Sequence, residues 1–264
     1  YEAMRYGVLN GGKRIRPVLL LEFCRICGGN IMDALPFACA VEMIHSYSLV
    51  HDDLPCMDND ALRRGKPSAH KAFGEDMALL AGDALLTKAF EVMLCPESLR
   101  LVSPSAAAQA AGILAKEAGC DGMVGGQVID LQSENKHISQ ELLEEMDGKK
   151  TIALIRAACL MGCTIGRGTP EDLKAAASFA EGIGLTFQVV DDILDIVGDT
   201  QMLGKTVGSD CENQKSTYVS LLGIEKATEV AHRLTAEACS ALAPFGERGK
   251  RLQALAYMLL ERKR

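Results

Sequence analysis

Two clusters of aspartates contain the residues best suited to chemistry. The first is the run DDLPCMD at 52–58, and the second is DDILD at 191–195. Asp191 and Asp195 are four residues apart, so they would share one face of a helix. In the first cluster Pro55 ends the helix, so Asp58 would return toward Asp52 through a turn. Carboxylates without His or Cys ligands at matching spacing suit Mg²⁺, which commonly bridges carboxylates to phosphate groups.

The alternative interpretation of such runs is a solvated acidic helix end. Two features favour metal binding instead. Carboxylates are disfavoured at a helix C-terminus, which already carries partial negative charge. Both clusters also interrupt apolar stripes at predicted helix ends. Several like charges placed in this way repel one another unless a cation neutralises them.

Basic residues are grouped, although the formal net charge is −7. The groups are Lys13 with Arg14 and Arg16; Arg63 with Arg64 and Lys66; and Lys149 with Lys150, followed by Lys205. Metal ions and such cations together can clamp a diphosphate and stabilise its charge as it leaves. The residues alone therefore predict departure or transfer of a diphosphate. The net negative charge argues against nucleic acid as a partner.

Three other patterns are weaker. Gly7–Lys13 fits the start of a P-loop, but Arg14 stands where Ser or Thr is needed and no strand precedes it. The glycines and Lys13 could still hold a phosphate. His51-Asp52 resembles the pair of metal-dependent phosphohydrolases, but the remaining histidines do not form a ligand set. Cys24 and Cys27 form a lone C-x-x-C without the second pair that a zinc site needs.

Helical periodicity recurs almost throughout the chain. In 33–55 the apolar positions fall three or four apart, with Pro36 suited to a first turn and Pro55 ending the run. A second helix is predicted after Thr169, whose TPED sequence reads as a cap. No run of strict alternation and no hairpin signal is evident. Since no linker divides the chain, residues 1–264 are predicted to form one all-α domain.

Composition is that of a soluble globular protein, with 264 residues, 48% of them apolar. No apolar run reaches the ~18 residues of a membrane span, so no stable membrane insertion is expected. The chain opens at Tyr1 without a leader, and the true start is expected to be missing. The ten cysteines, Cys39 among them, are expected to be mostly buried, reduced thiols in a reducing, cytoplasmic setting.

Seven motifs in order resemble the trans-isoprenyl diphosphate synthases, most closely the bacterial farnesyl diphosphate synthases. They are GGKRIRP (11–17), DDLPCMD (52–58) with LRRGKP (62–67), AGDALL (81–86), GGQVIDL (125–131), KTIALI (150–155), FQVVDDILD (187–195) and GKTVGSD (204–210). The resemblance covers nearly the whole chain. It implies an antiparallel all-α bundle around a deep central cavity, a homodimer, and a further N-terminal helix before Tyr1.

The resemblance also assigns roles by position. For isopentenyl diphosphate it implies Lys13, Arg16, His45 and Arg64. For the allylic diphosphate it implies Arg63, Lys150, Thr151, Gln188, Lys205 and Lys215. For Mg²⁺, as three ions once diphosphate is bound, it implies Asp52, Asp58 and Asp191 as direct ligands, with Asp53, Asp192 and Asp195 in support. The implied reaction is ionisation of the allylic diphosphate, attack by the isopentenyl double bond, and loss of a proton to the released diphosphate.

Product length is predicted from Tyr47. Ser48 lies one helical turn before Asp52, beneath the first cluster, and Tyr47 lies beside it. Spacing leaves open whether the Tyr47 ring faces a cavity or the core. The resemblance implies that this position floors the product tunnel, where a bulky aromatic fits a fifteen-carbon product.

Three rival functions remain. The first is a geranylgeranyl diphosphate synthase, which has nearly the same motifs. The second is a terpene cyclase, against which Lys13, Arg16 and Arg64 argue because it needs no second diphosphate site. The third is a non-catalytic partner subunit, against which the intact acidic clusters argue.

Overall fold

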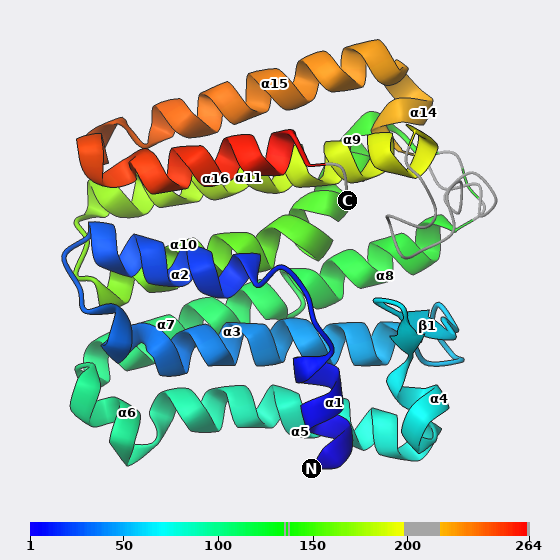
Figure 1. Cartoon of the computed structure of the whole chain (residues 1–264), viewed down its shortest axis with the longest axis horizontal. Helices are drawn as coiled ribbons and strands as arrows, with labels where there is room; N and C mark the ends of the chain where they lie inside the picture. The colour runs from blue at the N-terminus through cyan, green and yellow to red at the C-terminus, as the bar shows by residue number, and fades with distance from the viewer. Residues whose placement is uncertain (135, 137, 198–216, 263–264) are drawn as a thin grey trace.

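The structure is a computed structural model that describes residues 1–134, 136, 138–197 and 217–262. It is an all-α bundle whose long helices run side by side (Figure 1). The helices are α1 Glu2–Leu9, α2 Ile15–Ile26, α3 Ile31–Asp52, α4 Ala69–Phe73, α5 Glu75–Leu94, α6 Pro96–Leu101, α7 Pro104–Ala118, α8 Met123–Ser133, α9 Gln140–Asp147, α10 Ala153–Ile165, α11 Pro170–Val197, α14 Tyr218–Leu222, α15 Ile224–Ala241 and α16 Lys250–Leu260. A π-helical turn, η1 Gly148–Ile152, and a 3₁₀ segment, η2 Ala243–Gly249, complete the helical elements.

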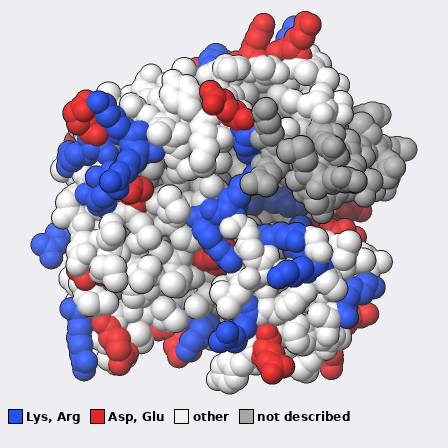
Figure 2. All heavy atoms as spheres, in the orientation of Figure 1, with Lys and Arg blue, Asp and Glu red and all other residues white. Residues whose placement is uncertain are grey.

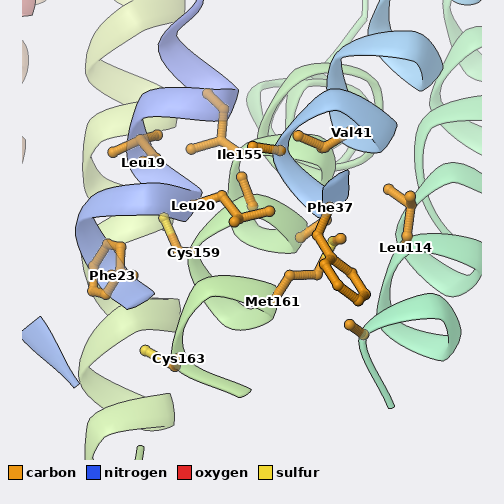
Figure 3. Close-up of a cluster of buried hydrophobic side chains, with 14 of the residues drawn as sticks. Leu19, Leu20, Phe23, Phe37, Val41, Leu114, Ile155, Cys159, Met161 and Cys163 are labelled. Atoms are coloured by element: carbon orange, nitrogen blue, oxygen red, sulfur yellow. The ribbon is translucent and has the colours of Figure 1, made fainter. Parts of the chain in front are cut away.

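Helix α10 forms the centre of the bundle. It packs against α2, α7 and α11, and most of its side chains are buried. Its neighbours contribute Leu20 and Phe23 from α2, Phe37 from α3, and Leu114 from α7 (Figure 3). This core holds the surrounding helices at fixed positions, so their ends can present polar residues in a defined geometry.

Local sequence accounts for the start of each acidic helix. The capping signal before α11 is confirmed, because Asp172 N donates to Thr169 Oγ1 (3.2 Å) and Thr169 N donates to Asp172 Oδ2 (2.9 Å). The first-turn placement of Pro36 is wrong. Helix α3 begins at Ile31, where Asn30 caps it by accepting a hydrogen bond from Met32 N (3.1 Å), and Pro36 lies inside the helix.

A short hairpin was not predicted from sequence. Strands β1 Leu62–Arg63 and β2 Lys66–Pro67 pair antiparallel, with Arg63 opposite Lys66. Arg64 and Gly65, which connect them, both have positive φ (55° and 75°), as a two-residue hairpin with a primed turn requires. Strands of two residues are too short to show alternation, which is why the pattern was missed.

The expectation that most cysteines are buried is wrong for the described residues. Cys24, Cys159 and Cys163 are buried, but Cys39, Cys56 and Cys120 are exposed and three others are intermediate. Cys39 is exposed because α3 turns Ala38 and Ala40 inward and Cys39 outward. All nine described cysteines are free thiols. Among the residues described, no helix is both long and apolar enough to span a bilayer.

Candidate functional site

Both acidic clusters lie at C-terminal helix ends that point to the same end of the bundle (Figure 1). Asp52 is the last residue of α3, and Asp191 lies in the last turns of α11. Asp58 returns toward Asp52 as predicted, since its backbone N–H donates to the Asp52 carbonyl oxygen (2.9 Å). The helical core thus places two acidic groups at one end.

A cavity of about 740 Å³, here called the basic cavity, lies between these ends. Its polar lining includes all four residues predicted for isopentenyl diphosphate, one residue of the second cluster and one near the C-terminal end: Lys13, Arg16, His45, Arg64, Asp191 and Arg262. Figure 2 shows Lys and Arg side chains gathered around a recess near the middle of one face. The arrangement suits an anion such as a diphosphate.

The glycine turn before α2 shapes this cavity. No strand precedes the turn, because α1 ends at Leu9, which rules out the P-loop interpretation. Gly11 and Gly12 have φ of 84° and 108°, and a Cβ on Gly12 would lie 2.6 Å from the Arg64 guanidinium. The Arg64 guanidinium also donates to the Gly11 carbonyl oxygen. The missing side chain therefore makes room for Arg64 at the cavity wall.

Positive charge predominates in the basic cavity, where the described lining includes six Lys and Arg side chains and the carboxylates of Glu42 and Asp191. Burial, and then nearby Arg16, Arg64, Arg14 and Arg63, hold the pKa of His45 well below its usual value. Burial also lowers the pKa of Arg16 to about 10; Glu42 acts to raise it and Arg64 lowers it further. His45 is therefore neutral at pH 7, and it can offer a hydrogen bond without adding to the positive charge.

A second cavity of about 490 Å³, here called the apolar cavity, runs beneath the first aspartate cluster. Asp52, Lys150 and Thr151 lie on its wall, with Tyr47, Ser48, Leu79, Val128 and Leu154 among its other lining residues. Arg16 and His45 line both this cavity and the basic one. The two cavities therefore meet at a shared wall, one with a charged lining and the other with an apolar lining.

Lys150 is held in place by a carboxylate partner. Its Nζ contacts Asp130 of the GGQVIDL motif. Although burial acts to lower the pKa of Lys150, Asp130, and then Asp52 and Asp58, raise it overall. Lys150 also lines a third, smaller cavity with Asp130, Asp147, Gln188 and Asp192. Thr151 Oγ1 donates to Gln188 Oε1 (3.4 Å), so three predicted allylic-site residues lie together.

The three aspartates predicted to support Mg²⁺ binding, Asp53, Asp192 and Asp195, are all buried. Arg63 Nε donates to Asp53 Oδ1 (2.8 Å), and Asp53 is only 2% exposed. Asp192 accepts from Gln188 Nε2 (3.1 Å) and Tyr218 N (2.8 Å), and Asp195 is buried. The allylic-site predictions for Lys205 and Lys215 fall outside the described residues.

The oxygen donors present suit Mg²⁺. Burial raises the pKa of Asp52 to about 6; Lys150 opposes this shift and Asp58 adds to it, so a nearby cation would stabilise the ionised form. In the part of the chain that the structure describes, no three carboxylate, His or Cys side chains are grouped as a metal site. Mg²⁺ commonly uses only one or two carboxylates, with water and phosphate oxygens completing its shell. The donor set of Asp52 and Asp58 fits that pattern.

Sequence reasoning missed three residues that contact the predicted site residues or line the cavities with them. Arg262, near the C-terminus, bonds to Asp191 across the basic cavity (2.9 Å). Asp130 was inside a recognised motif but had no assigned partner. Asp147 is 4% exposed, and one of its carboxylate oxygens has no hydrogen-bond partner. A basic C-terminal tail was the one available signal for Arg262, and it gave no spatial information.

An all-α bundle with paired acidic helix ends and two adjoining cavities defines a class of enzymes that handle diphosphates of apolar alcohols. The polyprenyl synthetase family model matches residues 1–253. The chain belongs to this family, and it is a prenyltransferase that acts in prenyl chain elongation.

Relatives and solved structures agree on the family. The chain is 50% identical over 248 residues to the large subunit 1 of the heterodimeric chloroplastic geranylgeranyl pyrophosphate synthase of Arabidopsis thaliana (93% of this chain, 67% of the relative). It is 50% identical over 249 residues to the chloroplastic geranylgeranyl pyrophosphate synthase of Capsicum annuum (94% and 67%). An FPP/GFPP synthase structure from Zymomonas mobilis superposes with a TM-score of 0.86 at 37% identity (98% and 87% covered).

Proposed function

We propose that this prenyltransferase condenses isopentenyl diphosphate with allylic diphosphates to give geranylgeranyl diphosphate. The observation that carries the proposal is the pair of cavities that meet at Arg16 and His45. The basic cavity suits the diphosphate group of isopentenyl diphosphate, the substrate that is added to the allylic chain. The apolar cavity, with Lys150 beside Asp52 at its polar end, suits an allylic chain whose diphosphate ionises there.

In this proposal the allylic C–O bond breaks and diphosphate leaves with the electron pair. The isopentenyl double bond attacks the allylic cation, and the released diphosphate takes the proton that is then lost. Lys150 and Thr151 bind the departing diphosphate, and Lys13, Arg16 and Arg64 orient the second substrate. Preorganised cations of this kind stabilise charge that develops in the transition state.

Magnesium belongs to the proposal as well. Asp52 and Asp58 from the first cluster and Asp191 from the second would hold it, with three ions present once diphosphate is bound. When bound, Mg²⁺ neutralises the departing diphosphate. The proposed roles of Asp53, Asp192 and Asp195 are indirect, because Asp53 is paired with Arg63 and Asp192 is bonded to the Tyr218 backbone.

A homodimer is also proposed. Apolar side chains of α5 and α8 are exposed beside one another at the apolar cavity, with Leu79 47%, Val124 43% and Val128 47% exposed. Val124 and Val128 also line the apolar cavity, so a second copy seated on this face would close that cavity from solvent. Light scattering after size exclusion tests this: a monomer at micromolar concentration would contradict it.

The twenty-carbon product is supported by the names of the relatives, several of them about 50% identical geranylgeranyl synthases. The fifteen-carbon product predicted from sequence is the second candidate. Tyr47 favours it, because this bulky ring lines the apolar cavity and is only 7% exposed. A putative farnesyl-diphosphate synthase structure from Marinomonas sp. MED121, 40% identical with a TM-score of 0.84 (98% and 88% covered), points the same way.

Product analysis decides between them. The protein is incubated with radiolabelled isopentenyl diphosphate and dimethylallyl, geranyl or farnesyl diphosphate in turn, with and without excess EDTA. We expect Mg²⁺-dependent conversion of all three to a twenty-carbon product. Accumulation of the fifteen-carbon product with farnesyl diphosphate left unused would favour the second candidate. No elongation from any allylic primer would refute both.

A further inference from the structure

Two cysteines from helices far apart in sequence meet at the end of the bundle opposite the acidic clusters. Cys27 caps the C-terminal end of α2, and Cys163 lies near the C-terminal end of α10. Their Sγ atoms are 3.5 Å apart. Cys163 is fully buried in the core beside α2 (Figure 3), whereas Cys27 is partly exposed.

Close packing of α2 on α10 produces this contact. A Cβ on Gly162 of α10 would lie 2.3 Å from the Leu20 carbonyl oxygen of α2, so the helices approach as closely as backbones allow. Cys163 follows Gly162 directly and is thereby brought against the end of α2. The contact is set by two rigid helices and not by a loop, which favours a reproducible geometry.

The two thiols differ in chemical character. The hydrogen bond with Cys163 lowers the pKa of Cys27, and Arg248 lowers it further, while burial and Asp172 act in the opposite direction. The same contact, and then burial, raise the pKa of Cys163. Burial raises the pKa of neighbouring Cys24 to about 11 and that of Cys159 well above its usual value. Cys27 is therefore the thiol of this group best able to react as a thiolate.

Cys27, the partly exposed thiol of the pair, is the one that an oxidant can approach from solvent. The residues that follow each cysteine line a cavity of about 260 Å³: Gly28 and Gly29 after Cys27, and Ile165, Gly166 and Arg167 after Cys163. Neither thiol is itself among the lining residues. Charges of both signs are present here, since Arg167 and Asp33 line the cavity and Arg248 and Asp172 lie near Cys27. The two cations can contact the carboxylates of a low-molecular-weight disulfide.

We propose that Cys27 and Cys163 form a redox modification site, which a small disulfide such as oxidised glutathione converts reversibly into an intramolecular disulfide. The Cys27 thiolate attacks one sulfur of the oxidant, and the first glutathione thiolate leaves and is protonated. Cys163 then loses its proton and attacks the Cys27 sulfur, which releases the second glutathione. Two protein thiols are oxidised by two electrons, and one small disulfide is reduced to two thiols.

The cross-link joins α2 to α10 at the ends that lie away from the basic cavity and the apolar cavity. Helix α2 has 12 residues, so Cys27 lies about 18 Å along the axis from the Lys13–Arg16 end. The bond therefore constrains the unfolded chain across a long loop while it leaves the substrate-binding end in place. We expect greater thermal stability and little change in the rate of elongation.

The test is redox equilibration of the whole protein in glutathione buffers, followed by alkylation and non-reducing peptide mapping. The expected product is a peptide pair linked through Cys27 and Cys163, with loss of two titratable thiols, reversal by dithiothreitol, and a melting temperature at least about 4 °C higher. The kcat should change less than twofold.

Matched variants complete the experiment. Cys163→Ser, and Cys163→Ala as a second version in case burial of a hydroxyl impairs folding, should stop at a glutathione adduct on Cys27. Cys39→Ser, at an exposed thiol outside the pair, should form the link as the wild type does. The proposal is overturned if wild-type Cys27 stays reduced, stops at the glutathione adduct, or links to another cysteine under conditions that oxidise free dithiothreitol.

Discussion

Arg262 reaches across the basic cavity and donates to Asp191, with a nitrogen–oxygen distance of 2.9 Å. Its guanidinium carbon also lies 3.9 Å from the centre of the Phe187 ring, and it donates to the Phe187 carbonyl oxygen (2.7 Å). Only 8% of the Arg262 side chain is exposed. The C-terminal end of the described chain is thereby fastened to the helix that carries the second acidic cluster.

The Arg262–Asp191 contact predicts that Arg262→Ala weakens binding of isopentenyl diphosphate and strengthens binding of Mg²⁺. Loss of a cation from the basic cavity should raise KM for isopentenyl diphosphate about tenfold, the scale of one charge-assisted hydrogen bond. Loss of the competing cation at Asp191 should lower the Mg²⁺ concentration needed for half-maximal activity. Steady-state kinetics with Mg²⁺ titration measures both, and Arg251→Ala, at a side chain 72% exposed, is the control. An unchanged KM would remove Arg262 from the binding site.

Lys13→Ala tests whether the two cavities bind different substrates. Lys13 lines the basic cavity, and the apolar cavity is lined by other cations, Arg16 and Lys150. We therefore expect KM for isopentenyl diphosphate to rise at least about tenfold, with KM for the allylic partner changed less than about threefold. Lys226→Ala, at an exposed position of α15, serves as a control. Equal effects on both substrates would mean that the sites are not separate.

Asp52→Ala removes a carboxylate that is needed chiefly as charge develops. Asp52 lines the apolar cavity next to Lys150, where the allylic diphosphate is proposed to leave. The kcat should fall at least about 10²-fold with a smaller change in KM, the signature of lost transition-state stabilisation. The exposed Asp121→Ala should retain wild-type kcat. A variant at position 52 with normal kcat would show that the first cluster is not catalytic.

The sequence predicted the helices well, because the apolar stripes of α3 and α11 repeat at helical spacing and the Thr169 cap has a clear signal. It also grouped Lys13, Arg16, His45 and Arg64, which come from three segments that only the tertiary fold brings together. That grouping came from motif resemblance, since spacing along the chain cannot place Lys13 near Arg64.

What the sequence did not predict depends on contacts between distant segments. Arg63 is bonded to Asp53 because the hairpin folds back onto α3, and two-residue strands carry no periodic signal. The Arg262–Asp191 bond joins the C-terminal end to α11, and the Cys27–Cys163 contact joins α2 to α10. Each depends on helix packing that is set by the whole core.

Asp147 provides a stability prediction. Burial, then Asp192 and Asp130, raise its pKa to about 8 from an ordinary 3.8. A carboxyl whose folded-state pKa is raised stabilises the fold fully below the unfolded value, and this stability is lost as pH rises from about 4 through 8. Asp147→Asn should thus match the wild type near pH 4 and be more stable by at least about 2 kcal/mol at pH 8.

Thermal melts across that pH range measure the difference, with exposed Asp121→Asn as the control. A gain of about 2 kcal/mol corresponds to roughly 4–8 °C for a chain of this size. A difference that is constant with pH would show that the effect comes from packing and not from ionisation of Asp147.

The final prediction concerns product length and Tyr47. Its ring lines the apolar cavity, 7% exposed, and stands edge-on to His51 with the ring centres 5.7 Å apart. Ser48, beside it, also lines the cavity, and its hydroxyl donates to the His45 carbonyl oxygen (2.9 Å).

Removing the Tyr47 ring leaves space along the path that a growing apolar chain would follow. Tyr47→Ala should therefore lengthen the main product by at least one five-carbon unit, whether the wild type stops at fifteen or twenty carbons. Tyr47→Phe keeps the ring and should leave product length unchanged, which separates bulk from the hydroxyl group. Chromatography of the dephosphorylated products gives the chain lengths. If Tyr47→Ala makes products of wild-type length at normal folding stability, the length limit lies at another residue of the cavity wall.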